Sequence, residues 1–349
     1  MDYALRLGRR ALGTTAENPP VGCIIVKNEK IVGVGWTQPG GRPHAETQAL
    51  AMAGQEAHGA TAFVTLEPCA HKGRTGPCAD ALVKAGISRV VTAIEDPDPR
   101  VSGAGHAVLR NAGISMQCGL LAEAARLDLA GFLTRVTRKR PYVILKMGIS
   151  ADGKIASAPG KRTPITGSQT KARVHLMRAQ CDAVLVGVQT VMTDDPELTC
   201  RLPGMEARSP IRIVADSNLS IPHTSKLVQT AEITPVWLLS TRKEALGPGI
   251  RTITCRPSNQ GQVDLEEALA HLATSGINRL LVEGGSVIAQ SFLDHDLVDE
   301  IQFFQSPAVL GEQGVDAIAD MPLSQLDARF KHAAKETLGS DTLTVYERR

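Results

Sequence analysis

Three short stretches decide the chemistry and the fold of the first part of this chain: Pro43-His44-Ala45-Glu46, Glu67-Pro68-Cys69 and Gly76-Pro77-Cys78. One imidazole (His44) and two thiolates (Cys69 and Cys78) make three zinc ligands. A structural zinc site fills all four tetrahedral positions, whereas a catalytic site keeps one position for water. The ligand set therefore predicts a catalytic zinc site.

Glu46 follows His44 by two residues and is not itself predicted to be a ligand. Zinc lowers the pKa of its bound water from 15.7 toward about 7, which makes hydroxide available near neutrality. A glutamate at this spacing is the proton shuttle of zinc-dependent nucleobase deaminases. We expect Glu46 to take a proton from that water and to pass it to the ring nitrogen and to departing ammonia. The predicted reaction is hydrolytic removal of an exocyclic amine from a heterocycle.

Both ligand segments are expected at the starts of helices. Pro43 ends the preceding loop, and residues 45–52 form an alanine-rich helical pattern. Pro77 occupies a position that first helical turns favour, and residues 79–85 continue that helix. A helix N-terminus favours an anion such as a thiolate. The alternative is a pair of buried thiols beside an unrelated surface histidine.

The spacing of the two cysteines departs from the general deaminase signature Pro-Cys-x-x-Cys, since eight residues separate Cys69 from Cys78. With Asn18-Pro19-Pro20-Val21-Gly22-Cys23 and Pro43-His44-Ala45-Glu46, the stretch 65–78 closely resembles the deaminase half of the bifunctional riboflavin biosynthesis deaminase–reductases. Gly76 stands where that family usually has proline. The candidate substrate contacts of the deaminase pocket are Asn18, Lys72, Arg74 and Asp96. Lys72 and Arg74 suit a phosphate, although free loop charges would look the same.

Composition limits the possible functions. A chain of 349 residues suggests two domains, and 43% hydrophobic residues support substantial cores. Aromatic residues are scarce at 3% and the net charge is only +2, which argues against a nucleic-acid partner. Beyond Cys69 and Cys78, the five other cysteines are expected to be reduced thiols in a cytoplasmic protein. We see no signal peptide and no apolar run of membrane-spanning length.

The chain alternates helix and strand patterns. In the first part, helices are expected at 2–12, 45–52, 79–85, 105–111 and 120–136, and strands at 22–27, 31–36, 61–66, 89–94 and 114–118. This order predicts a three-layer sandwich around a parallel or mixed sheet, and the resemblance implies a cytidine-deaminase-like fold. Arg138-Lys139-Arg140-Pro141 ends the last helix. We therefore predict two domains, residues 1–140 and 141–349.

In the second part, helices are expected at 168–178, 264–275 and 285–294, and strands at 142–147, 182–187, 211–216, 236–240, 279–283 and 300–307. There is no Gly-x-Gly-x-x-Gly fingerprint, which disfavours a standard Rossmann domain. A strand does lead into Glu283-Gly284-Gly285-Ser286 and then into a helix, where exposed amides can hold a phosphate. A tight turn that needs glycine for its geometry is the equally weighted alternative.

Several segments of this second part resemble the reductase half of the same family, among them 146–154, 186–199 and Val282-Glu283-Gly284-Gly285. The resemblance implies a dihydrofolate-reductase-like α/β fold and NADPH as cofactor. The cofactor contacts that it implies are Ile149, Pro164, Thr190, Asp194, Ser217, Gly285, Ser286, Val287, Ile288, Ala289, Gln290 and Ser291. The substrate contacts that it implies are Arg162, Arg178, Leu198, Arg201 and Glu283. The family often has tryptophan near Pro164, which puts that contact in doubt; Arg178 could equally be an exposed helix charge, and Asp194-Asp195 a loop cap.

We interpret the chain as a bifunctional enzyme of riboflavin biosynthesis. The first domain, with one Zn²⁺, is expected to deaminate 2,5-diamino-6-(5-phosphoribosylamino)pyrimidin-4-one. The second is expected to reduce the ribosyl side chain to ribityl with NADPH. The alternatives are an RNA-acting base deaminase with an appended recognition domain and a non-catalytic zinc-stabilised protein. A phosphorylated pyrimidine is the expected partner, with neither nucleic acid nor membrane; the sequence leaves a homo-oligomer open.

Overall fold

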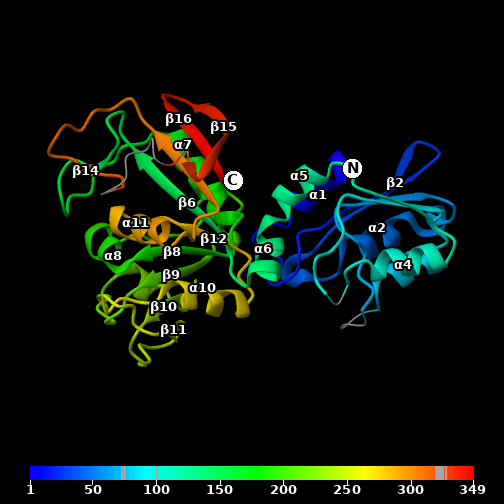
Figure 1. Cartoon of the computed structure of the whole chain (residues 1–349), viewed down its shortest axis with the longest axis horizontal. Coiled ribbons are helices and arrows are strands. Elements are labelled where there is room, and N and C mark those ends of the chain that lie inside the picture. Colours follow the sequence, from blue (N-terminus) through cyan, green and yellow to red (C-terminus); the bar gives the residue numbers. More distant parts are fainter. Residues whose placement is uncertain (72–75, 100, 319–325, 327) are drawn as a thin grey trace. The chain divides into compact units, whose positions relative to one another are not determined.

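A computed structural model describes residues 1–71, 76–99, 101–318, 326 and 328–349. The chain divides into two compact units, Met1–Arg140 and Pro141–Arg349. Each unit has its own hydrophobic core. Figure 1 shows the helices and strands of both units.

The first unit is built around a five-stranded mixed sheet in the order β2-β1-β3-β4-β5. Strands β3, β4 and β5 are parallel, and β1 is antiparallel to both β2 and β3. Helices α1 and α5 lie on one side of the strands, and α2 and α4 lie on the other. The elements are α1 (Asp2–Arg9), β1 (Gly22–Lys27), β2 (Lys30–Trp36), α2 (Ala45–Ala53), β3 (Thr61–Val64), α3 (Cys78–Lys84), β4 (Arg89–Thr92), α4 (Ala104–Asn111), β5 (Ser115–Cys118), α5 (Ala122–Asp128) and α6 (Ala130–Arg138), with 3₁₀ turns at Pro39–Gly41 and Gly54–Ala57.

The single helix expected over residues 120–136 is wrong. Leu121 has a left-handed backbone conformation, so the helix starts only at Ala122. At Leu129, with φ −93° and ψ 3°, the backbone leaves the helical region, which separates α5 from α6. Lys139, again left-handed, ends α6 just before the boundary between the units.

The second unit is built around a nine-stranded sheet in the order β11-β10-β9-β8-β12-β6-β13-β16-β15. The strands from β11 to β13 are parallel, and β16 and β15 follow antiparallel. The elements are β6 (Tyr142–Ile149), β7 (Lys154–Ala156), α7 (Ser168–Ala179), β8 (Ala183–Gly187), α8 (Val188–Asp194), β9 (Ile211–Ala215), α9 (Lys226–Gln229), β10 (Val236–Ser240), β11 (Ile250–Thr254), α10 (Leu265–Thr274), β12 (Arg279–Val282), α11 (Ser286–Asp294), β13 (Glu300–Gln305), β14 (Val315–Asp316), β15 (Phe330–Leu338) and β16 (Asp341–Arg348), with a 3₁₀ turn at Glu206–Arg208.

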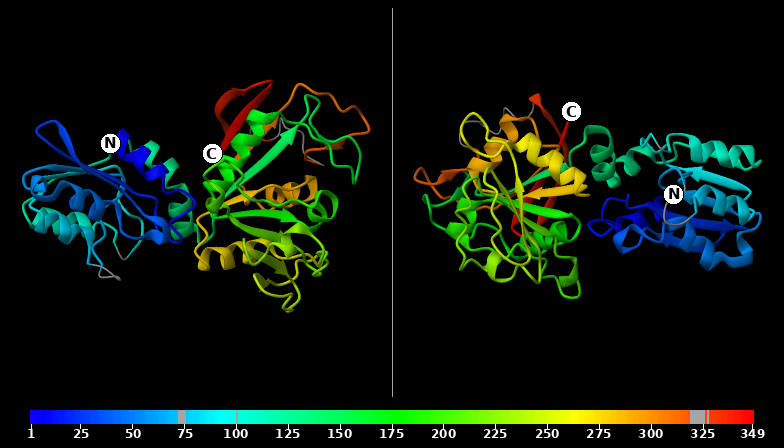
Figure 2. Two further views of the ribbon diagram at one scale, coloured as in Figure 1. Left: turned by 180° about the vertical axis from the view of Figure 1, so that it is seen from behind. Right: turned by 90° about the horizontal axis from the view of Figure 1, so that it is seen from below.

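The central parallel strands of this sheet are buried on both faces, which explains why they read as continuous apolar runs. In β8, Leu185 belongs to the core shared with α10 and α11, whereas Val184 and Val186 belong to the core shared with α7 and α9. Alternate residues thus serve opposite faces of a three-layer α/β/α arrangement. The sequence did not predict the hairpin β15–β16, red in Figure 2, whose first strand is largely exposed.

Candidate active sites

Two glycines of β2 bring α2, and with it His44 and Glu46, close to the sheet. A Cβ atom on Gly33 would lie 2.2 Å from the carbonyl oxygen of Ala49, and one on Gly35 would lie 2.1 Å from that of Ala45. The helix can approach only because these positions carry no side chain and because α2 presents alanines to the strand. His44 is the N-cap residue of α2 in extended conformation, so its ring is placed by the start of the helix.

The Cys69 segment is fixed against α4 by Glu67, a residue that sequence analysis quoted but gave no role. The Glu67 carboxylate accepts backbone N–H bonds from Asp96 (3.1 Å), Gly103 (3.0 Å) and His106 (3.1 Å). A Cβ on Gly105 would lie 1.9 Å from the carbonyl oxygen of Pro68. The possible ligand atoms of Glu67, Glu95 and His106 lie within 4.8 Å of one another, as those of a metal site would. Because three backbone donors already use the Glu67 carboxylate, we interpret it as a structural tie.

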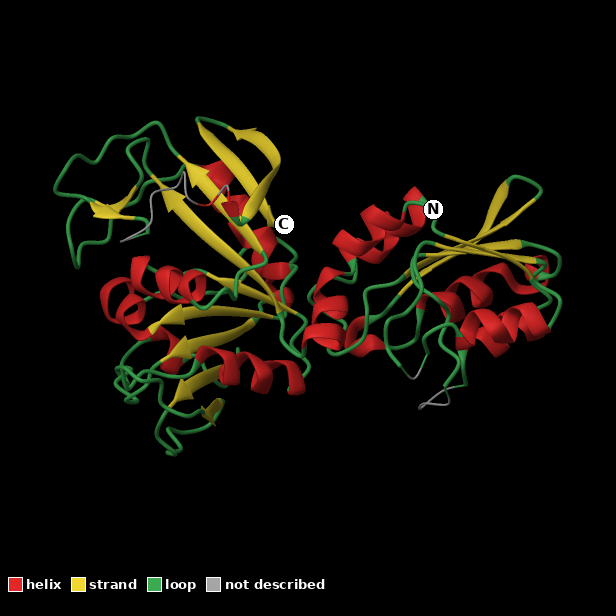
Figure 3. Cartoon of the chain, in the orientation of Figure 1, coloured by secondary structure: helices red, strands yellow, loops and turns green. Residues whose placement is uncertain are grey.

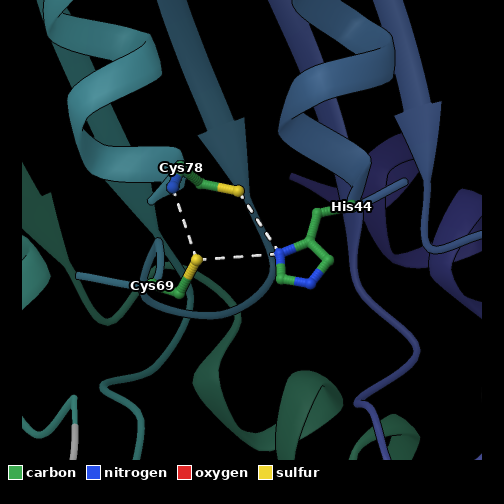
Figure 4. Close-up of side chains that lie close together, drawn as sticks. All are labelled: His44, Cys69 and Cys78. Atoms are coloured by element: carbon green, nitrogen blue, oxygen red, sulfur yellow. Dashed lines mark hydrogen bonds between the residues drawn. The ribbon is translucent and has the colours of Figure 1, made fainter. Parts of the chain in front are cut away.

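The three predicted ligands converge (Figure 4). His44 Nδ1 lies 3.7 Å from Cys69 Sγ and 3.3 Å from Cys78 Sγ. Zinc bonds of about 2.1 Å to nitrogen and about 2.3 Å to sulfur, at a tetrahedral angle, place the two donor atoms about 3.6 Å apart. The two observed distances bracket that value. The donor set and its spacing therefore fit a zinc ion, with Nδ1 as the histidine donor.

The thiols of Cys69 and Cys78 are joined by a hydrogen bond, so they share one proton. The backbone N–H of Cys78, at the first residue of α3, donates to Cys69 Sγ over 3.3 Å. Hydrogen bonding from the Cys78 side chain lowers the pKa of Cys69 to about 4, while the same contact raises the pKa of Cys78. This contact favours a thiolate at Cys69, and both sulfurs would be thiolates when they hold a metal ion.

Glu46 is buried beside this cluster, with 4% of its surface exposed. Burial first, and the nearby Cys69 thiolate second, raise the pKa of Glu46 to about 7. A carboxyl group with a pKa near neutrality can both accept and release a proton. The burial of Glu46 and its pKa suit the role of a proton shuttle.

Of the four remaining deaminase candidates, the structure describes Asn18 and Asp96 but not the other two. The Asn18 side chain packs over Gly41, where a Cβ would meet Asn18 Nδ2 at 2.0 Å, three residues before His44. Asp96 is buried and accepts a hydrogen bond from the backbone of Asp98 over 2.9 Å. Lys72 and Arg74 lie outside the described residues.

In the second unit, the candidate residues gather at the carboxyl edge of the parallel strands. Thr190 and Asp194 lie in α8 directly after β8, Ser217 follows β9, and Glu283 and Gly285 follow β12. Ile149 ends β6 and is buried. Ligands of open α/β sheets bind at this edge. The edge thus carries most of the proposed cofactor and substrate contacts.

Arg178 and Glu283 bind each other there. Arg178 Nε donates to Glu283 Oε1 over 2.6 Å and Nη2 donates to Oε2 over 3.0 Å, with only 11% and 9% of the two side chains exposed. The alternative of an exposed helix charge at Arg178 is therefore wrong. Burial raises the pKa of Glu283, but Arg178 and Lys146 outweigh it and hold that pKa below its ordinary value.

Two further residues, Lys146 and His175, act electrostatically on Glu283. The sequence had suggested a role for neither. Lys146 Nζ lies 3.9 Å from Glu283 Oε2, and burial lowers the pKa of this lysine while Glu283 opposes the shift. His175, one turn before Arg178 on α7, places Nδ1 3.1 Å from the Thr199 carbonyl oxygen and accepts from the Arg201 backbone N–H at 3.2 Å. Lys146 belonged to a quoted motif, whereas only the i, i+3 spacing on α7 pointed to His175.

Other implied contacts are less favourably placed. Ala289 is fully buried in the core, and the Gln290 and Ser291 side chains bond within their own helix, to Asp294 and to Val287. Within the stretch 285–291, this leaves the free amides of the first helical turn, at residues 286–288, as the donors for a ligand. Ile288 is partly buried, and the Val287 side chain is exposed.

The loop candidates differ in burial. The Ser217 hydroxyl already donates to Gln262 and accepts from the Val263 amide. Leu198 is buried in a left-handed conformation. Pro164, Arg162 and Arg201 are exposed, and Arg201 pairs with Glu197 over 3.0 Å. Burial raises the pKa of Asp194, an effect that Arg162 opposes.

In the part of the chain that the structure describes, no helix combines the length and the apolarity needed to cross a membrane.

Comparison with known proteins gives a consistent result for both units. The cytidine and deoxycytidylate deaminase zinc-binding region matches residues 1–94, and the RibD C-terminal domain matches residues 141–344. The riboflavin biosynthesis protein RibD of Escherichia coli is 41% identical over 343 residues, covering 92% of this chain and 93% of that protein. RibD of Aquifex aeolicus is 39% identical over 354 residues, covering 100% and 97%.

Solved structures agree. RibD of Acinetobacter baumannii, form 1, matches with a TM-score of 0.90 at 36% identity, covering 100% of this chain and 97% of that one. A Thermotoga maritima protein described as a diaminohydroxyphosphoribosylaminopyrimidine deaminase and 5-amino-6-(5-phosphoribosylamino)uracil reductase matches with a TM-score of 0.90 at 35% identity and the same coverage. The predicted fold class, a deaminase-like unit followed by a reductase-like α/β unit, is confirmed.

Proposed function

This chain belongs to the RibD family of riboflavin biosynthesis proteins, and on that premise we propose which of its residues carry out the two reactions of the family. The protein is a bifunctional enzyme, a zinc-dependent deaminase and an NADPH-dependent reductase. The deaminase acts on 2,5-diamino-6-(5-phosphoribosylamino)pyrimidin-4-one, and the reductase converts the ribosyl side chain of the product to ribityl. The RNA-acting alternative has no support in these similarities.

We assign the deaminase chemistry to the cluster of His44, Cys69 and Cys78 with Glu46. The single observation that carries this assignment is the convergence of one nitrogen and two sulfurs beside a buried carboxyl group whose pKa is about 7. Bound by these three residues, zinc supplies the activation that lowers the pKa of a water molecule. Glu46 takes the proton from the attacking water and delivers it to the ring nitrogen, and a second transfer protonates the departing amine.

We assign the reductase chemistry to the carboxyl edge of the second sheet. NADPH supplies the hydride when it is bound. The amides of Ser286, Val287 and Ile288 hold its pyrophosphate, as helix N-termini do. The reduction also consumes one proton, and we assign its delivery to the partly buried Lys146, whose Nζ lies 3.9 Å from Glu283 Oε2. Glu283, held by Arg178 through both of its oxygens, orients the lysine.

The Arg178 fork is already occupied by Glu283, and its Nη1 donates to the Thr199 carbonyl oxygen over 3.0 Å. Arg178 therefore orders the site, and the exposed Arg201 is the better candidate for the substrate phosphate. We further propose that the two units divide the activities at residue 140, and that the protein acts in the cytoplasm, where the five cysteines that are not zinc ligands stay reduced.

One experiment tests both assignments. Zinc-loaded protein is offered the deaminase substrate with and without NADPH, and the products are identified by mass. We expect the deaminated ribosyl compound without NADPH and its ribityl form with it. A chelator should stop the first reaction and spare the reduction of substrate that is already deaminated. Equal loss of both reactions on chelation would contradict the assignment to two separate sites.

A further inference from the structure

The carboxyl edge of the second sheet extends well beyond the start of α11. Strands β12, β8, β9 and β10 are neighbours in that order, and their arrows point the same way in Figure 3. At about 4.8 Å per strand, the end of β10 lies roughly 14 Å from the end of β12 along this edge. A dinucleotide whose pyrophosphate rests on the α11 amides, as proposed above, can place its adenosine over β9 and β10.

The acidic residue at the end of β9 does not face that space. In dinucleotide enzymes that use NAD, an acidic side chain near such a strand end binds the ribose 2′-hydroxyl. Here Asp216 is 1% exposed. Its Oδ1 accepts from the amide and the hydroxyl of Ser220, both over 2.9 Å, and its Oδ2 accepts from the Ile221 amide over 2.7 Å. The Asp216 carboxylate is therefore used within its own loop. It contributes no exposed negative charge at the end of β9.

The loops after β9 and β10 are tied together instead. The Ser217 carbonyl oxygen accepts from the Ser240 hydroxyl (2.9 Å), the Thr241 hydroxyl (2.8 Å) and the Thr241 amide (3.2 Å). These bonds bring the next residues of the two loops side by side, and Arg242 Nη2 contacts Asn218 Oδ1 over 3.5 Å. An exposed guanidinium and a neutral amide therefore share one position at the edge.

Arg242 differs from the other arginines of β11 and of the loops after β10 and β11. Arg256 pairs with Glu267 (3.2 Å) and Asp264 (3.9 Å), and Arg251 stacks on the Trp237 ring at 4.7 Å. Among the described residues, no carboxylate forms an ion pair with Arg242. Its charge is available to a ligand.

We propose that Arg242, with Asn218 beside it, binds the 2′-phosphate of NADPH and makes the reductase prefer NADPH to NADH. A guanidinium binds phosphate oxygens through paired, charge-assisted hydrogen bonds. The proposal rests on the assignment of the cofactor to this edge.

Binding of adenosine fragments to the full-length, zinc-loaded protein tests the proposal without turnover. Adenosine 2′,5′-bisphosphate and adenosine 5′-monophosphate are titrated calorimetrically against wild type, Arg242→Gln and Lys243→Gln. Lys243 is the exposed neighbouring cation and serves as the matched control. Arg242→Gln should weaken the bisphosphate and NADPH by about 10- to 100-fold, the worth of a charge-assisted contact. The same variant should change binding of the monophosphate and NADH by less than about 2-fold, and Lys243→Gln should change none of the four by more than about 3-fold.

Three results would overturn the proposal: unchanged NADPH affinity in Arg242→Gln, equal loss for NADPH and NADH, or an equal effect of Lys243→Gln. None of these three results contradicts the assignment of the cofactor to this edge, provided that the wild-type protein binds NADPH. If wild type does not bind NADPH, the cofactor assignment itself fails, and this proposal fails with it.

Discussion

Two adjacent glycines follow β12, and they are expected to have different roles. Gly285 is assigned to ligand binding, whereas Gly284 is required for packing. At Gly285 the backbone has φ −73° and ψ −179°, which any residue adopts, and an added Cβ would meet no atom within 4 Å. At Gly284 an added Cβ would lie 1.6 Å from Ile288 Cγ2 and 3.1 Å from Ile288 Cβ. The alternative raised by the sequence, a glycine required for local geometry, therefore applies to Gly284 through packing and not to Gly285.

Gly285→Val should leave the second unit folded and weaken NADPH binding. A side chain at this position stands before the free amides of α11, and each charged hydrogen bond lost costs about 1.5–3 kcal/mol, or about 10- to 150-fold in affinity. Gly284→Ala should instead destabilise the unit by about 1–3 kcal/mol, because a β-branched side chain in a helix has few other rotamers to which it can move.

The measurements are an NADPH titration by nicotinamide fluorescence and a urea unfolding curve for each variant. Zinc content and deamination, which belong to the first unit, serve as controls and should not change. A folded Gly285→Val protein with normal NADPH affinity would refute the phosphate site at α11. An unfolded Gly285→Val protein would refute the structural distinction between the two glycines.

Substitutions at Glu46 and Lys146 test the two proposed proton donors, one in each unit. Glu46→Gln should lower the deamination rate by at least about 10²-fold while keeping one zinc per chain, whereas Cys78→Ser should lose the metal; a zinc-free Glu46→Gln protein would show that Glu46 is a ligand. Lys146→Met should slow NADPH oxidation by about 10²- to 10⁴-fold in single turnovers with little change in cofactor affinity. Restoration of the rate by Lys146→Arg would mean that charge alone matters at this position.

Sequence could predict most of the first unit because local signals there agree with the fold. Gly22–Lys27 is the strand expected, and α2 extends one residue beyond residues 45–52. Asn28 and Glu29 between β1 and β2 both have positive φ, as a tight hairpin turn requires. The ligand spacing named three residues whose atoms do converge. What the spacing could not give is the support from Glu67, because that carboxylate binds backbone amides of a loop far along the chain.

The second unit was harder to predict because its site is assembled from strand ends that are distant in sequence. The apolar runs identified β8, β9 and β10, but β15, the first strand of the hairpin β15–β16, is largely exposed and has no apolar alternation to reveal it. Strand order depends on packing between segments, and no local pattern encodes it. Asp216 and Arg242 show the consequence, since only the paired loops reveal which of the two charges is turned outward.

The Arg178–Glu283 pair shows what a motif leaves undetermined. The family resemblance implied Arg178 and Glu283 as two separate substrate contacts. In the structure, 105 positions of sequence separate two side chains that neutralise each other in a nearly dry setting. Removing one partner of such a pair leaves an uncompensated buried charge, at a cost of about 3–5 kcal/mol. The pair is therefore best understood as the rigid support that keeps Lys146 and the Thr199–Arg201 segment in place. A change at Arg178 should consequently affect substrate binding and the stability of the unit together, whereas a change at the exposed Arg201 should affect binding alone.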